Sequence, residues 1–192
     1  MTIIRDMNAG LSQSLGSAAR ELAEKAAASG VRSVLVGGFA MQHYCPERLT
    51  ANLDFAASGP LPHLPHLGEL PCGGHHSVGP GGVPVKWILR KDDYQALFEE
   101  AVARPAEGSG AFAGLPVVGP EYLAAMKLVA RRLSDQADLE LLVLSGRVEV
   151  PLARSIIKGV LGAYAADAWD RAVALARWRA EREKAWLSGT GW

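Results

Sequence analysis

The sequence is short of the features that mark several large classes of protein. Only two of its 192 residues are cysteines, Cys45 and Cys72, too few for the disulfide framework of a small secreted domain. Charge of one sign is not in excess either, because 20 basic and 20 acidic residues give a formal net charge of zero. General nucleic-acid binding, which usually needs a basic domain, is therefore not expected.

Long apolar runs are missing as well. Charged residues and glycines interrupt every hydrophobic stretch before it reaches the length of a membrane span. The N-terminal residues show no signal-peptide pattern. We therefore expect a cytoplasmic protein without a membrane partner, in which both cysteines are reduced.

What is present is enough apolar material for a core, since 49% of the residues are hydrophobic. Helix-like and strand-like periodicities alternate irregularly and then give way to helices only. This order predicts an α+β (mixed α/β) fold, with a mixed sheet flanked by helices and a C-terminal helical extension. We expect an α/β core over residues 1–118 and a helical region, packed on that core, over residues 119–192. The expected helices are 9–28, 39–44, 92–103, 120–133 and 134–144, followed by two helices between 151 and 186. The expected strands are 31–36, 48–57 and 83–90, with a short strand within the otherwise loop-like stretch 70–78 and a short extended piece at 115–118.

The most informative stretch is the turn after the first predicted strand. Gly37 and Gly38 end that strand and directly precede a short helix. Glycines let a backbone approach a ligand closely, and a helix N-terminus favours a phosphate. In the next strand, period-2 alternation sends Leu49, Ala51, Leu53 and Phe55 to the core and Arg48, Thr50, Asn52 and Asp54 to the other face. A plain tight turn beside a solvated strand face is the alternative.

These motifs, in this order, resemble the nucleotidyltransferase superfamily, and most of all the small bacterial proteins around the AbiEii-type toxin nucleotidyltransferases. That family's core reads Gly-Gly, a helix, then Arg-x-Thr-x-Asp-apolar-Asp. Here the chain has Val-Gly-Gly-Phe-Ala-Met-Gln-His-Tyr at 36–44 and Arg-Leu-Thr-Ala-Asn-Leu-Asp at 48–54. Residues 82–89 match the strand with the family's third carboxylate, and residues 119–138 match a later helix with a Lys, an Arg and an Asp pair. The resemblance implies a nucleotidyltransferase-like fold.

The metal-binding carboxylates of the family are partly replaced in this chain. Asn52 stands at the first aspartate, Asp54 keeps the second, and Lys86 stands at the third. In the family the carboxylates hold two divalent ions about 3.5–4 Å apart, and Mg²⁺ prefers anionic oxygens. We therefore expect Lys86 to pair with Asp54, two-metal catalysis to be absent, and Asp54 to be the one remaining candidate ligand for Mg²⁺. An exposed Lys86 with a weak pair or none is the alternative.

The resemblance also implies a nucleotide, an NTP, along the glycine turn and near the later helix. The implied nucleotide-binding residues are Gly37, Gly38, Phe39, Arg48, Thr50, Lys127 and Arg131. If the later helix is continuous, Lys127, Arg131, Asp135 and Asp138 form one stripe. An ordinary solvated face with pairs four residues apart is the alternative interpretation of that stripe.

Three functions remain open from the sequence. The first is a pseudoenzyme of this fold that binds a nucleotide. The second is an active enzyme that transfers NMP from NTP to a protein, RNA or small-molecule acceptor, which would need an acid beside Asp54, with Glu47 and Asp92 as candidates. The third is a non-enzymatic interaction module, whose helical tail from Pro151 docks a protein partner or a second copy. A toxin–antitoxin role would fit the AbiEii resemblance.

The sequence also contains a group of zinc-type ligands and several tryptophans in the helical tail. Cys72, His75 and His76 are zinc-type ligands, but no fourth is evident and the glycine-rich setting favours a loop. Tryptophans in the helical tail are expected to pack in the core, with a partner surface as the alternative; they are Trp169, Trp178 and Trp186.

Overall fold

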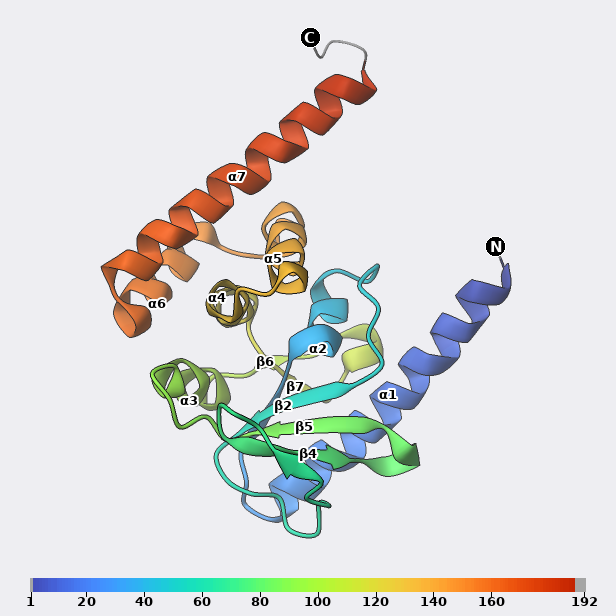
Figure 1. Ribbon diagram of the computed structural model, residues 1–192. Coiled ribbons are helices and arrows are strands. Elements are labelled where there is room, and N and C mark those ends of the chain that lie inside the picture. Colours follow the sequence, from blue (N-terminus) through green and yellow to red (C-terminus); the bar gives the residue numbers. More distant parts are fainter. Residues whose placement is uncertain (1, 189–192) are drawn as a thin grey trace. The chain divides into compact units, whose positions relative to one another are not determined.

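The structure is a computed structural model that describes residues 2–188 and, within them, the side chains of residue 12 onward. It divides into two compact units, Met1–Gly119 and Pro120–Trp192. The predicted fold class is confirmed: a mixed sheet is flanked by helices and followed by a helical C-terminal region (Figure 1). Among the described residues, no helix combines the length and the apolar character that crossing a membrane requires.

A seven-stranded sheet forms the centre of the first unit, in the order β3-β4-β5-β2-β1-β7-β6. Its middle consists of β1, which runs antiparallel to β2, and of β5, which runs parallel to β2. The elements of this unit are α1 (Thr2–Ala28), β1 (Ser33–Val36), α2 (Gly37–Tyr44), β2 (Leu53–Ala57), β3 (Gly68–Glu69), β4 (Gly74–Val78), β5 (Pro84–Ile88), α3 (Gln95–Ala103), β6 (Ala106–Glu107) and β7 (Pro116–Val117), with 3₁₀ turns at Pro80–Gly82 and Gly110–Phe112.

The strand β1 is buried on both faces, as its apolar sequence from Val34 to Val36 predicts. Val34, Leu35 and Val36 are each at most 3% exposed. On β5, Val85 and Trp87 are buried while Lys86 between them is only half-buried. Leu22 of α1 and Val85 both lie close to the α-carbon of Gly79, which places α1 on the face that carries Val85. The polar Lys86 therefore points to the opposite face.

The strand predicted over residues 48–57 is shorter in the structure, where β2 begins only at Leu53. Leu49, predicted to face the core, is 49% exposed, so that prediction was wrong. The cause lies in the neighbouring strand: Val36, the last residue of β1, pairs with Asp54, and the chain then leaves the sheet at Gly37 to form α2. Residues before Leu53 consequently have no partner on β1.

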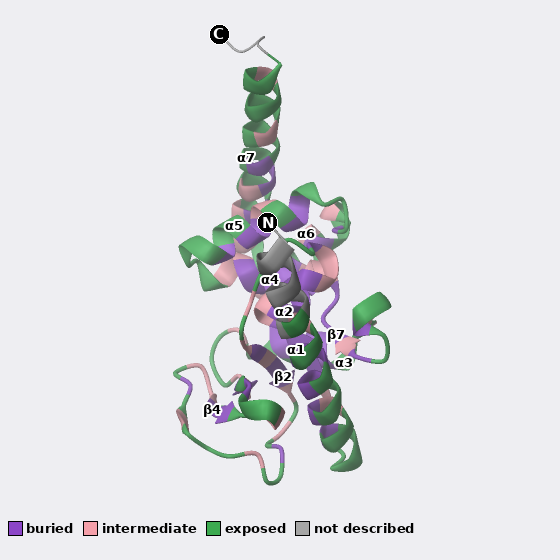
Figure 2. Cartoon of the chain, turned by 90° about the vertical axis from the view of Figure 1, so that its right-hand side faces the viewer, coloured by how far each residue is buried: buried purple, intermediate pink, exposed green. Residues whose placement is uncertain are grey.

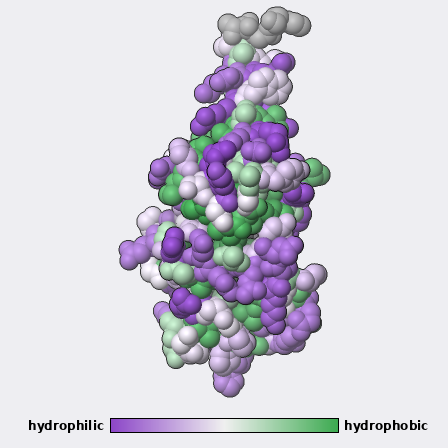
Figure 3. All heavy atoms as spheres, turned by 90° about the vertical axis from the view of Figure 1, so that its left-hand side faces the viewer, coloured by the Kyte–Doolittle hydropathy of each residue, from purple (hydrophilic) through white to green (hydrophobic). Residues whose placement is uncertain are grey.

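The second unit consists of four helices: α4 (Pro120–Ala130), α5 (Leu133–Leu144), α6 (Val150–Leu161) and α7 (Ala163–Leu187). Trp169 is fully buried and its indole N–H donates to the Val150 carbonyl at 3.3 Å, which confirms the predicted packing. For Trp178 and Trp186 that prediction was wrong, because they are 52% and 75% exposed. Both lie in the C-terminal part of α7, after its last buried residue, Ala176. Side chains in this part of the helix are mostly exposed and hydrophilic (Figures 2 and 3).

A buried cluster of charges joins α4 to α5. The ammonium of Lys127 donates to Asp135 Oδ1 at 2.8 Å and to Asp138 Oδ2 at 2.7 Å, and all three side chains are at most 7% exposed. Arg132 adds a hydrogen bond to Asp135 Oδ2 at 2.6 Å. The stripe expected for a continuous helix does not form, because the chain breaks at Arg131, which has a φ of 57°, and α5 begins at Leu133, close to the second helix expected from 134. A solvated charged face is excluded for these two carboxylates.

The pKa of Asp135 reflects two opposing effects. Burial alone would raise it, but the hydrogen bonds from Arg132 and Lys127 favour the ionised form and hold the pKa below its usual value. Asp135 therefore favours its ionised form, paired with Lys127 and Arg132.

We expect Lys127→Met to destabilise the protein by about 3–5 kcal/mol, the usual range when one partner of a buried ion pair is removed. Denaturant unfolding would measure this loss. Lys158→Met, on the exposed side of α6, is the matched control and should change the free energy of unfolding by about 0.5 kcal/mol or less. Equal losses in the two variants would contradict a buried role for Lys127.

Acid should weaken the cluster in a defined direction. Because the folded-state pKa of Asp135 is lowered, its contribution to stability is complete above the ordinary Asp pKa of about 3.9 and is lost as the pH falls through the folded-state value. Unfolding free energies measured from pH 6 down to pH 3 should therefore fall more steeply for the wild type than for Asp135→Asn. Parallel pH profiles would show that Asp135 titrates alike in the folded and unfolded chains.

Candidate nucleotide-binding site

The candidate site is built where β1 passes into α2 and β2 begins. Gly37 has a φ of 67°, a conformation that glycine adopts at little cost. A Cβ atom at Gly37 would lie 2.1 Å from Asp54 Oδ2, and one at Gly38 would lie 2.8 Å from Thr50 Oγ1. The side chains of Asp54 and Thr50 therefore pack directly against the two glycine α-carbons. The Gly-Gly pair and the polar residues after it belong to one structure.

A chain of polar contacts runs through these side chains. Thr50 Oγ1 donates to Asn52 Oδ1 at 3.3 Å, and Asn52 Nδ2 donates to Asp54 Oδ1 at 2.8 Å. Lys86 Nζ lies 3.5 Å from the same oxygen, with Asp54 15% and Lys86 34% exposed. The register explains this meeting, because Asp54 and Lys86 are paired residues on the parallel strands β2 and β5. The predicted Lys86–Asp54 ion pair is confirmed.

The short helix α2 begins at Gly37 rather than at Phe39 as predicted. Phe39 is 3% exposed, and its ring centroid lies 4.8 Å from that of Phe112. Its side chain therefore belongs to the core, and only its backbone can face a ligand. Val36, the residue before the helix, provides no side-chain cap, so the first-turn N–H groups of α2 carry the positive end of the helix dipole without one.

The other implied phosphate ligands lie in different settings. Arg48, in the turn before β2, is half-buried and its guanidinium donates to the Leu49 carbonyl. Lys127 and Arg131 belong to the second unit. The ammonium of Lys127 is already held by two carboxylates, and contact with a phosphate would require it to leave both. Arg131 is exposed at the break between α4 and α5, and its role stays a prediction.

The residues present do not fit the pair of divalent ions that the family resemblance implies. Two unit charges about 4 Å apart interact by about 4 kcal/mol at an effective dielectric of 20. A cation at such a distance from both Asp54 and Lys86 would gain from the carboxylate about what it loses to the ammonium. The amide of Asn52 turns its N–H toward Asp54, so its oxygen is directed to Thr50 instead. Within residues 2–188, no three or more His, Cys, Asp or Glu side chains form a metal-binding group.

The two alternative acids do not complete a carboxylate set in this geometry. Glu47 is exposed in the turn after α2. Asp92 follows the far end of β5, where its Oδ1 accepts from Arg90 Nε at 2.7 Å and from the Tyr94 N–H at 3.2 Å. The hydrogen bond from Arg90 is the main reason that the pKa of Asp92 lies below its usual value. Asp92 is thus an ion-pair partner at the opposite end of the strand from the glycine turn.

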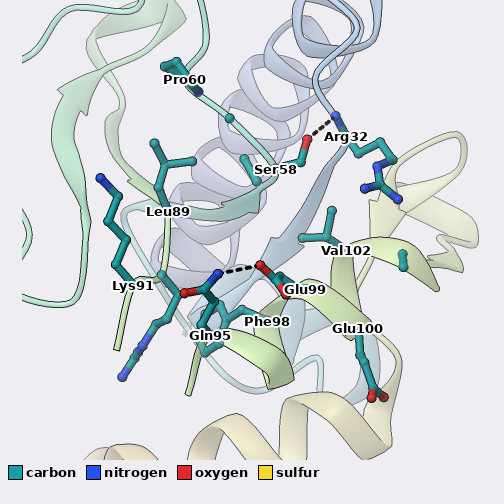
Figure 4. Close-up of a pocket in the computed structure, with 14 residues that line it drawn as sticks. Arg32, Ser58, Pro60, Leu89, Lys91, Gln95, Phe98, Glu99, Glu100 and Val102 are labelled. Carbon is teal, nitrogen blue, oxygen red and sulfur yellow. Dashed lines mark hydrogen bonds between the residues drawn. The ribbon is translucent and has the colours of Figure 1, made fainter. Parts of the chain in front are cut away.

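A cavity of about 680 Å³ opens at that opposite end, between the β2 and β5 termini and α3. Arg32, Lys91 and Glu99 line it, together with apolar side chains such as Leu89 (Figure 4). None of the predicted site residues contributes to its lining. The cavity and the glycine turn are therefore separate features of the sheet.

The strand β4 decides whether the predicted zinc-type ligands can come together. Residues 74–78 form this strand, within the stretch 70–78 where a short strand was expected, so the loop prediction holds for Cys72 but not for His75 and His76. His75 points into the core and His76 to solvent, hence they lie on opposite faces and cannot share one ion. His76 is paired in register with Lys86, and it extends the row from Asp54 through Lys86. Sequence reasoning missed this neighbour, although the alternation over 74–78 was a usable signal.

Comparisons with known proteins add little detail. No protein-family model matches the chain, and no curated protein matches its sequence. Among solved structures, the chain is similar to an antigenic nucleotidyltransferase-like protein from Paracoccidioides brasiliensis, with 14% identity, a TM-score of 0.46, and coverage of 84% of this chain and 92% of that one.

We expect Gly37→Ala to lose more stability than Gly30→Ala. Both glycines have a positive φ, near 67° and 69°, so both variants carry the same backbone strain of about 1–2 kcal/mol. Only at Gly37 does the new methyl group collide with a side chain, that of Asp54, whereas nothing lies within 4 Å at Gly30. Thermal unfolding of the two variants would compare them. Equal losses would show that Asp54 does not pack on Gly37.

Proposed function

We propose that the chain is a nucleotidyltransferase-fold protein that binds a nucleotide at the glycine turn and has lost nucleotidyl transfer. The observation that carries this is the ammonium of Lys86, 3.5 Å from Asp54 Oδ1, at the position that the family resemblance assigns to a carboxylate. An acidic metal site has thereby become a neutral ion pair. Nucleotidyl transfer in the family depends on two divalent ions that activate the attacking oxygen and steady the leaving pyrophosphate.

Nucleotide binding needs fewer residues than transfer does. The backbone N–H groups at Gly37, Gly38 and Phe39 open α2 without a side-chain cap, an arrangement that favours phosphate oxygens. Thr50 lies against Gly38 and offers a hydroxyl beside the same turn. Arg48 is the nearest arginine in sequence to this polar segment. Lys127 has no part in this binding mode, because its ammonium is held inside the second unit.

The wider assignments follow the family resemblance. We further propose that the chain is related to AbiEii-like proteins and is cytoplasmic. We also propose that it acts with a protein partner, as the members of a toxin–antitoxin pair do. The exposed Trp178 and Trp186 favour a partner or a second copy on α7 as an additional function of the helical unit.

Two measurements on the intact protein test the main proposal. Each of the four NTPs at about 100 times its dissociation constant should raise the free energy of unfolding by about 2.7 kcal/mol. Incubation with α-labelled NTPs should leave protein and RNA unlabelled. Gly37→Ala, checked for folding, should lose the stabilisation because the turn is distorted.

The competing functions give different results. An active enzyme would incorporate label into protein or RNA only in the presence of Mg²⁺, and Asp54→Asn would not incorporate it. That result would overturn the proposal that the chain has lost nucleotidyl transfer. No stabilisation by any NTP would overturn nucleotide binding and favour the interaction module.

A further inference from the structure

The polar groups around Asp54 have a fixed direction. An ionised carboxylate only accepts hydrogen bonds, so the amide of Asn52 must present its N–H, as it does at 2.8 Å from Asp54 Oδ1. Lys86 approaches the same oxygen at 3.5 Å. Donors therefore converge on the atom that would otherwise ligate a cation.

The same arrangement suits an anion. The Lys86 ammonium has three N–H donors and is 34% exposed, so contact with Asp54 does not exhaust it. The start of α2, whose first residue touches Asp54 Oδ2, adds main-chain donors and the positive end of the helix dipole. Exposed His76 continues the row beyond Lys86.

We infer that this site binds the phosphate groups of a nucleotide without a divalent cation, with Lys86 in place of the metal. This rests on the proposed nucleotide-binding function and specifies the form of the ligand as the metal-free nucleotide. Lys86 neutralises Asp54 and offers its remaining donors to phosphate oxygens. Asn52 holds the carboxylate in place from the other side.

Calorimetry with ATP, in EDTA and in millimolar Mg²⁺, tests the inference on the full chain. We expect the affinity in EDTA to equal or exceed that in Mg²⁺. Lys86→Met should weaken metal-free binding by about tenfold or more, as expected when a charge-assisted contact is lost. Lys91→Met is the matched control: this exposed lysine follows the far end of β5 and should bind ATP as the wild type does.

A second readout needs no nucleotide. Asn52→Asp combined with Lys86→Glu restores carboxylates at the two replaced positions and should create stoichiometric Mn²⁺ binding, detectable by electron paramagnetic resonance. The wild type should show none at the same concentration. Thermal unfolding without ligand establishes that each variant is folded.

The outcomes separate this inference from the function on which it rests. ATP binding that appears only with Mg²⁺ would overturn the metal-free mode and leave nucleotide binding intact. Stoichiometric Mn²⁺ binding by the wild type that is lost in Asp54→Asn would overturn it as well. No ATP binding in either buffer would overturn both proposals. Equal affinities of Lys86→Met and the wild type would remove Lys86 from the site.

Discussion

The first unit depends on the close approach of Asp54 to Gly37. The carboxylate occupies the space that a Cβ would take at Gly37, at a residue with a φ of 67°. This approach fixes three features together: where β1 ends, where α2 starts, and which β2 residue faces the turn. Because Asp54 is also paired in register with Lys86, the same contact decides which β5 side chain meets the carboxylate.

The sequence predicted the middle of the sheet better than its margins. The run from Val34 to Val36 and the alternation around Lys86 reflect burial by their neighbours, so both strands could be recognised locally. The strand at 48–57 was predicted too long, because its length depends on a partner that leaves the sheet at Gly37. The two-residue strand β6 has no periodicity to read and was not predicted, whereas β7 lies within the extended piece expected at 115–118. Both depend on neighbouring strands, because β7 pairs with β1 and β6 pairs with β7.

The charged residues of the second unit show a different limit. Spacing would place Lys127, Asp135 and Asp138 on one stripe only if the helix were continuous, but the chain breaks at Arg131 and α5 packs against α4. The charges then meet across two helices and are removed from water together. No sequence pattern reports the positive φ of a non-glycine residue, since arginine is not a residue that favours it. The predicted second helix from 134 agrees with α5, but the meeting of these charges across two helices was not predicted.

The candidate site and the buried cluster both pair carboxylates with cationic side chains, but they differ in how far these side chains are buried. In the cluster, two carboxylates at most 2% exposed pair with Lys127, which is 7% exposed, and one of them, Asp135, also pairs with Arg132. At the glycine turn, a single carboxylate meets one ammonium, and that ammonium is still 34% exposed. A buried ion pair such as that of Lys127 with Asp135 and Asp138 contributes to the fold. At the glycine turn, Lys86 is partly exposed and lies near a helix start that has no side-chain cap from Val36. This difference in burial is why the glycine turn, and not the cluster, is the place to look for an anionic ligand.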